Sequence, residues 1–198
     1  MDRFQNTKQP DWGWWGRLWP APGETLRDLG LSAGDSVVEI GCGNGYFAIP
    51  SAHIVAPATV YALDLDAALL AELDTLADQQ DIENLVTVEG DARNLTDHLS
   101  DPVDVALLAN TCHGIENADP IVTAVEDSLS DDGRFVVINW VDRPREATTV
   151  AGEPRGPPTD LRLSPEETEQ MVEDASDLTL TRQIDIPPYH YALVYTID

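Results

Sequence analysis

Three glycines at alternate positions follow an apolar segment that contains one acid. The stretch reads SVVEIGCGNGYFAI, with Glu39 two residues before Gly41 and further glycines at Gly43 and Gly45. A strand, a glycine turn and the start of a helix form a corner where a ligand can approach bare backbone and free N–H groups. In G-x-G-x-G the third glycine comes one position earlier than in the dinucleotide pattern G-x-G-x-x-G. The pattern indicates a site for an anionic or nucleoside ligand, although a tight turn without a ligand needs the same glycines.

Polar residues close the next three apolar segments. Asp64 ends the second segment, where an acid can accept hydrogen bonds from both hydroxyls of a ribose. Asp91 follows the third, within EGDAR, near the expected position of an adenine amino group. The fourth, VDVALLANTCHG, brings Asn110 and His113 to the point where the strand order should reverse, and ligands bind there in open α/β sheets. The four strand ends therefore predict one shared ligand crevice.

These residues need a sheet whose strand ends meet at one edge. The apolar, β-branched segments expected as strands cover residues 36–40, 59–64, 85–90, 103–110 and 134–140. Helical patterns separate them at residues 44–55, 66–79 and 118–129. The alternation predicts right-handed βαβ units and a parallel sheet covered by helices on both faces.

The last third of the chain departs from this alternation. Prolines and glycines interrupt residues 141–163, which predicts an irregular loop or lid rather than a helix or strand. A helix should begin after Ser164, a suitable N-cap that Pro165 follows. Two final strands joined through Pro187 and Pro188 favour an antiparallel pair at the edge of the sheet.

The ordered motifs resemble those of the class I S-adenosylmethionine-dependent methyltransferases over nearly the whole chain. VVEIGCGNG is similar to their first motif, and VYALDLD, GDA and VDVALLANTCH are similar to their ribose motif, adenine motif and methyl-bordering strand. The resemblance implies a three-layer α/β fold with a doubly wound seven-stranded sheet, order 3-2-1-4-5-7-6 with strand 7 antiparallel. It also implies S-adenosyl-L-methionine as cofactor. The cofactor-binding residues that it implies are Glu39, Gly41, Cys42, Gly43, Gly45, Asp64, Leu65, Asp91, Ala92 and Asn110.

The family shares no catalytic residue, so the acceptor side is interpreted from this sequence alone. His113 is the candidate base, with capping of its loop as the alternative. Aromatic and basic residues are candidates for substrate contacts: Trp15, Trp19, Trp140, Arg143 and Arg155. The tryptophans could instead pack the N-terminal arm on the core, and the arginines could pair with surface acids. Cys42 and Cys112 lack zinc or disulfide spacing, so we expect buried thiols and no metal.

The composition bounds the class of protein. Thirty-six acids oppose 11 basic residues in 198, giving a net charge of −25 and favouring a halophilic source whose cytoplasmic salt screens the repulsion. Without clustered lysines or an apolar span we expect no nucleic-acid partner, no signal peptide and no membrane segment. We expect one domain over 1–198, with a Trp-rich arm and first helix in 1–30. The function expected is methyl transfer to a small molecule, with a non-catalytic S-adenosylmethionine-binding module and an NAD-dependent oxidoreductase as alternatives.

Overall fold

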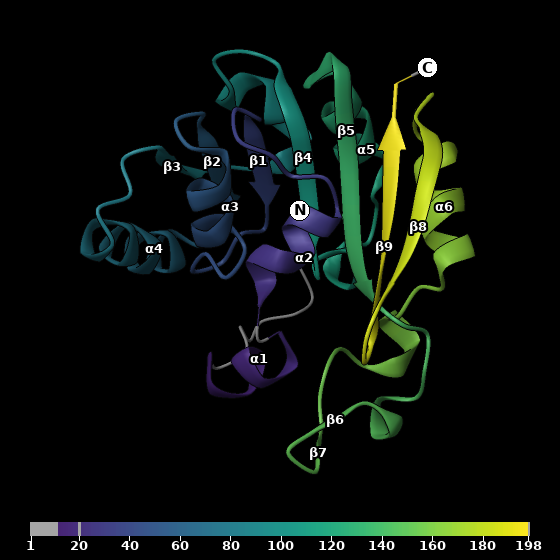
Figure 1. Cartoon of the computed structure of the whole chain (residues 1–198). Coiled ribbons are helices and arrows are strands. Elements are labelled where there is room, and N and C mark those ends of the chain that lie inside the picture. Colours follow the sequence, from purple (N-terminus) through teal and green to yellow (C-terminus); the bar gives the residue numbers. More distant parts are fainter. Residues whose placement is uncertain (1–11, 20, 198) are drawn as a thin grey trace.

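The computed structural model describes residues 12–19 and 21–197, except for the side chains of Trp12 and Trp14. Its centre is a seven-stranded sheet in the order β3-β2-β1-β4-β5-β9-β8 (Figure 1). The strands are β1 Val37–Ile40, β2 Val60–Asp64, β3 Leu85–Glu89, β4 Val103–Ala109, β5 Leu129–Trp140, β8 Thr179–Ile186 and β9 His190–Thr196. Strands β1 to β5 pair in parallel, and β9 is antiparallel to both neighbours. Since β8 and β9 are the sixth and seventh strands of this sheet along the chain, the expected order is confirmed.

Helices cover both faces of the sheet, so the three-layer α/β fold is also confirmed (Figure 1). The α-helices are α1 Trp12–Leu18, α2 Pro22–Asp28, α3 Ala48–Val55, α4 Ala67–Gln79, α5 Asp119–Glu126 and α6 Pro165–Glu173. One apolar core lies between the sheet and α2, α3 and α4, and the other lies under α5, α6 and the 3₁₀ helix η1 Ala92–His98. None of the helices in the described ranges is long and apolar enough to cross a membrane.

The central strands are buried on both faces, as parallel strands between two helical layers require. All four residues of β1 are buried, and one of them is Glu39. A buried carboxylate is rare unless it has a partner. Its position near the end of β1 therefore marks the region where a ligand would fit.

Of two helix starts predicted from the sequence, that of α6 is confirmed and that of α3 is wrong. Ser164 accepts a hydrogen bond from the Glu167 N–H at 3.1 Å, and the Glu167 side chain accepts one from the Ser164 N–H at 2.8 Å, so α6 begins as expected. Helix α3 begins at Ala48 rather than at Asn44. Gly45 has φ +89°, and a left-handed residue cannot continue a right-handed helix.

The loop after β5 contains more structure than expected. It forms the 3₁₀ turns η3 Arg145–Ala147 and η4 Thr159–Leu161, and a hairpin of β6 Thr149–Val150 and β7 Glu153–Pro154. Ala151 and Gly152 turn this hairpin with φ of +54° and +84°, as a two-residue hairpin turn requires. In Figure 1 this loop and α1 lie at the end of the sheet toward which the β1 arrow points.

Candidate functional site

One large cavity opens where the carboxyl ends of β1 to β5 meet. Its volume is about 1890 Å³. Typical small-molecule sites measure about 300–1,000 Å³, so this cavity has room for two ligands. Its glycine-turn side is formed by residues 39–43, 63–69 and 89–93. Its β5 side is formed by Trp15, Tyr46, Phe47, His113, Trp140 and residues of the 145–160 loop. Asn110, which follows β4, also lines the cavity.

The three glycines serve different purposes. Gly41, Gly43 and Gly45 all have positive φ, between +55° and +89°. Gly41 and Gly43 line the cavity, and a Cβ on Gly41 would lie 2.8 Å from the Thr111 side chain. Gly45 is not among the described lining residues; a Cβ there would overlap Leu73 of α4. The third glycine therefore permits close packing of α4, a role that the spacing alone does not distinguish from ligand approach.

Asp64 holds the glycine turn in place. The Gly43 N–H donates to Asp64 Oδ2 at 2.7 Å, and the Asp66 N–H donates to Asp64 Oδ1 at 2.9 Å. Asp64 also lines the cavity, beside Leu65. The carboxylate expected to bind a ribose is thus fixed by backbone donors at the cavity surface.

Two buried polar groups beside the turn lack partners among the described residues. They are Oε2 of Glu39, which is 2% exposed, and both side-chain amide atoms of Asn110. Burial, and then the nearby charge of Asp64, raise the pKa of Glu39. Asn110 stands at the end of β4 with φ +56°, and both residues line the cavity. Because unsatisfied buried groups are costly, a ligand with a cationic or hydrogen-bonding group fits here.

Asp91 is paired within its own motif. Arg93 Nε donates to both carboxylate oxygens of Asp91 at 3.0 Å, and the Arg93 backbone N–H donates to Oδ1 at 3.0 Å. These bonds lower the pKa of Asp91. Asp91, Ala92 and Arg93 all line the cavity. The sequence EGDAR displays this pair at i and i+2, yet the sequence interpretation assigned only the acid.

His113 lies in the 3₁₀ turn η2 Cys112–Gly114 and lines the cavity. Its side chain is buried, and burial followed by the charge of Arg162 lowers its pKa to about 4. The ring is therefore neutral near pH 7 and able to accept a proton, but it is a weak base. Burial raises the pKa of Cys112 to about 12, and Cys112 and Cys42 are both free and buried. Cys42 lines the cavity and its thiol pKa is also raised.

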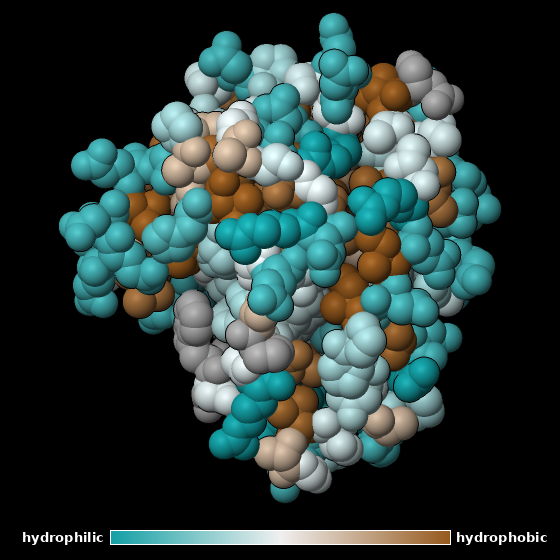
Figure 2. Space-filling view, in the orientation of Figure 1, coloured by the Kyte–Doolittle hydropathy of each residue, from teal (hydrophilic) through white to brown (hydrophobic). Residues whose placement is uncertain are grey.

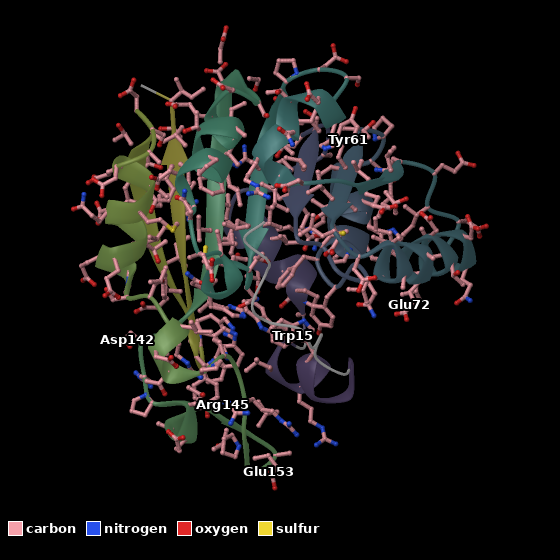
Figure 3. The ribbon with its side chains drawn as sticks, turned by 180° about the vertical axis from the view of Figure 1, so that it is seen from behind. Trp15, Tyr61, Glu72, Asp142, Arg145 and Glu153 are labelled. Atoms are coloured by element: carbon pink, nitrogen blue, oxygen red, sulfur yellow. The ribbon has the colours of Figure 1, made fainter. Side chains whose placement is uncertain are left out.

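Among the substrate candidates, Trp15, Trp140 and Arg155 line the β5 side. Trp19 is buried and packs against Phe47, with ring centroids 5.2 Å apart, instead of lining the cavity. Arg143 is exposed and lies outside the described lining residues, whereas Arg145 belongs to them. Figure 3 shows Trp15 and Arg145 at the same end of the molecule, from α1 and from the loop after β5. Sequence reasoning missed Arg145 because it cannot tell which arginine of this loop turns inward.

Residues 31–179 match a family model described as a methyltransferase domain. The chain belongs to the methyltransferase family. Among the described residues of this methyltransferase no cluster of His, Cys, Asp and Glu could hold a metal ion.

Solved structures share the fold of this chain, and curated relatives share part of its sequence. The fold is similar to that of a SAM dependent methyltransferase from Aquifex aeolicus, with TM-score 0.79 and 20% identity over 92% of this chain and 93% of that one. The glycopeptide N-methyltransferase MtfA, complexed with S-adenosyl-L-methionine, has TM-score 0.70 and 13% identity over 90% and 87%. S-adenosyl-L-methionine is the cofactor of this family. The groups of Glu39 and Asn110 that have no partner among the described residues fit its methionine part.

One curated relative is named a probable cobalt-precorrin-6B C(15)-methyltransferase (decarboxylating), from Methanosarcina mazei. It is 32% identical over 119 residues, which are 59% of this chain and 61% of the relative. A protein of the same name from Methanosarcina acetivorans is 30% identical over the same share. The methyltransferase thus spans about three fifths of the length of these curated relatives.

Proposed function

We propose that this methyltransferase binds S-adenosyl-L-methionine on the glycine-turn side of the cavity and methylates a small molecule held on the β5 side. The observation that carries the proposal is the pair of buried groups on Glu39 and Asn110 that have no partner among the described residues and line the same cavity as Gly41 and Gly43. A ligand with an ammonium group and a carboxylate would satisfy both, because the ammonium can donate to Glu39 and the carboxylate can accept from the Asn110 amide. The names of the two Methanosarcina relatives, which give a cobalt-precorrin as the probable substrate, support a small-molecule acceptor.

The residues of the glycine-turn side would hold the cofactor by hydrogen bonds. Glu39 accepts from the ammonium group, Asp64 from the ribose and Asp91 from the adenine amino group, while Leu65 and Ala92 cover the adenine. Asn110 closes the site at the end of β4. When bound, S-adenosyl-L-methionine supplies a methyl group on sulfur: an acceptor lone pair forms the new bond to carbon while the C–S electron pair returns to sulfur.

The residues of the β5 side would position the acceptor. Methyl transfer depends mainly on alignment and exclusion of water, which can contribute about 7–11 kcal/mol. Trp15 and Trp140 supply apolar walls, Arg155 a positive charge, and Trp19 supports Trp15 from behind, with ring centroids 6.3 Å apart. His113 stays neutral near pH 7 because its pKa is about 4, so its role is to accept a hydrogen bond that orients the acceptor. The exposed Arg143 has no place in this arrangement.

The working environment follows from composition. The net charge of −25 supports one acidic domain working in a salt-rich cytoplasm, where ions screen its self-repulsion. Hydrophilic residues cover most of the face in Figure 2. The composition disfavours a nucleic-acid acceptor, because phosphate binding normally requires clustered Lys and Arg and the chain has only 11 of them.

Calorimetry in molar salt tests the cofactor. We expect S-adenosylhomocysteine to bind more tightly than NAD. Glu39→Gln should lower the affinity for S-adenosylhomocysteine about tenfold, because a hydrogen bond to a charged group contributes about 1.5–3 kcal/mol. Glu83→Gln is the matched control, since Glu83 is exposed and outside the cavity. Tighter binding of NAD would overturn the proposal.

Transfer itself is tested with S-adenosylmethionine labelled in its methyl group. Incubation in molar salt with a panel of small molecules should label at least one of them, and the label should disappear when Asn110 is replaced by Ala. Cofactor binding without label in any compound would favour the non-catalytic binding module.

A further inference from the structure

The β5 side of the cavity is walled by aromatic rings that come from distant parts of the chain. Trp15, Tyr46, Phe47 and Trp140 are all buried and line the cavity. The ring centroids of Trp15 and Trp140 lie 6.4 Å apart with their planes tilted by 31°, and those of Trp15 and Tyr46 lie 5.7 Å apart. Aromatic walls of this kind contact flat ring systems favourably.

A buried arginine contacts both Trp140 and the loop after β5. Arg162 is 5% exposed, and its guanidinium lies 5.3 Å from the centre of the Trp140 ring. Its Nη2 donates to Thr148 Oγ1 at 2.9 Å, and its Nε donates to the Pro157 carbonyl at 3.2 Å. Trp140 and the loop that faces it are therefore held in one arrangement before any acceptor binds, which lowers the entropic cost of binding.

The close fit at Gly156 leaves that loop little freedom. Gly156 has φ +91°, and a Cβ there would lie 2.8 Å from Trp140 and 2.9 Å from Arg162. Gly156 and the residues on either side of it, Arg155 and Pro157, line the cavity. The backbone between the positive charge of Arg155 and the ring of Trp140 is thus set by packing.

On the β5 side of the cavity, basic side chains are more buried than acidic ones. Arg145 and Arg155 are half-buried, whereas Glu146 and Asp160, which line the same part, are exposed. Arg145 Nε donates to the Gly156 carbonyl at 3.1 Å, so backbone oxygens orient its guanidinium. Half-buried charges are screened less by salt than exposed ones, so Arg145 and Arg155 keep more of their attraction for an anion at molar salt than exposed arginines would.

We propose that the acceptor is a flat aromatic acid, whose ring lies against Trp140 and Trp15 and whose anionic group is bound by Arg155 and Arg145. This inference rests on the proposed function for the identity of the reaction, but not for the chemistry of the cavity wall. It narrows the acceptor to aromatic carboxylates and their close analogues.

Four naphthalene-sized probes test the proposal. They are 2-naphthoate, 2-naphthylmethanol, 2-naphthylmethylamine and the saturated decahydro-2-naphthoate. Each is titrated into the protein with and without saturating S-adenosylhomocysteine, at one fixed molar salt concentration. We expect 2-naphthoate to bind about tenfold more tightly than the alcohol or the saturated acid, and the amine to bind least.

Variants assign the preference to residues. Arg155→Gln should reduce the preference for the acid over the alcohol, because only Arg145 is left to bind the anionic group. Arg143→Gln should leave the preference unchanged, because Arg143 is exposed outside the cavity. Trp140→Leu should remove the preference for the aromatic over the saturated acid. If Trp140→Leu fails to fold, Trp15→Leu tests the same preference from the other ring.

Several outcomes would overturn the proposal: equal affinities for the acid and the alcohol, tightest binding of the amine, or an unchanged acid preference in Arg155→Gln. Failure of the proposed function has a different signature. If S-adenosylhomocysteine does not bind, the assignment of the site to a methyl donor is wrong. The probe titrations without S-adenosylhomocysteine still show whether the β5 side prefers a flat, anionic ligand.

Discussion

Replacing Gly45 by alanine separates two reasons for a glycine in the turn. An alanine at φ +89° costs about 1–2 kcal/mol of backbone strain. Its Cβ would also overlap Leu73, a fully buried residue of α4, and such overpacking costs about 1–3 kcal/mol. We therefore expect Gly45→Ala to lower the free energy of unfolding by about 2–5 kcal/mol, measured by urea unfolding at fixed molar salt.

Gly34 offers the matched control. Its φ is +95°, and nothing lies within 4 Å of a Cβ built there. Gly34→Ala should therefore lose only the strain, about 1–2 kcal/mol. The double variant Gly45→Ala, Leu73→Ala should lose less stability than the sum of the losses of its two single variants, because Leu73→Ala removes the side chain that the new Cβ overlaps. Equal losses in the two single glycine variants, or strict additivity in the double variant, would refute the packing role of Gly45.

Further predictions concern the cofactor, salt, acid and the buried arginine. Asp64→Ala should weaken S-adenosylhomocysteine at least about tenfold in calorimetry, since it removes the expected ribose contact and the bond to the Gly43 N–H; an unchanged affinity in a folded protein would contradict it. The melting temperature should fall from molar to millimolar salt, because a net charge of −25 loses its screening; a flat series would show that the charge is no salt adaptation. Burial lowers the pKa of His113 to about 4 and that of His190 to about 3, against 6.5 ordinarily. As pH falls, these histidines are therefore protonated in the unfolded chain before they are protonated in the folded protein. The stability contributed by the two neutral rings is complete above pH 6.5. It is lost as pH falls from 6.5 toward the folded-state pKa values, at about 1.4 kcal/mol per pH unit for each ring. His190→Asn should reduce that slope in urea unfolding between pH 6.5 and 4. Arg162→Gln should raise the pKa of His113, followed by NMR, because the positive charge beside the ring is gone; no movement would show that burial alone holds it low.

The sequence predicted the sheet and the glycine turn because both depend on local patterns. Alternating apolar segments and helical patterns predicted a parallel sheet between helices, whereas the strand order came from the resemblance of the motifs to those of class I methyltransferases. The N-cap of α6 was visible in Ser164 and Pro165. The start of α3 was placed too early because the sequence does not show that Gly45 adopts a left-handed φ.

The cavity wall could be predicted only in part, because it depends on contacts between distant residues. Nothing local distinguishes the inward Arg145 from the exposed Arg143; the 3₁₀ turn and the Gly156 carbonyl decide it. Likewise the overlap at Gly45 involves Leu73 of α4, which comes after α3 and β2 in the chain. The assignments of Asp64, Asp91 and His113 to particular ligand atoms remain predictions.

The aromatic wall has a practical consequence for optical measurements. The chain has five tryptophans, and all of them stand in α1, directly after it, or at the end of β5: Trp12, Trp14, Trp15, Trp19 and Trp140. No tryptophan belongs to the glycine-turn side, which residues 39–43, 63–69 and 89–93 form. The intrinsic fluorescence of the protein is therefore a label-free reporter of one end of the molecule, and it should respond strongly to an acceptor that touches Trp15 or Trp140.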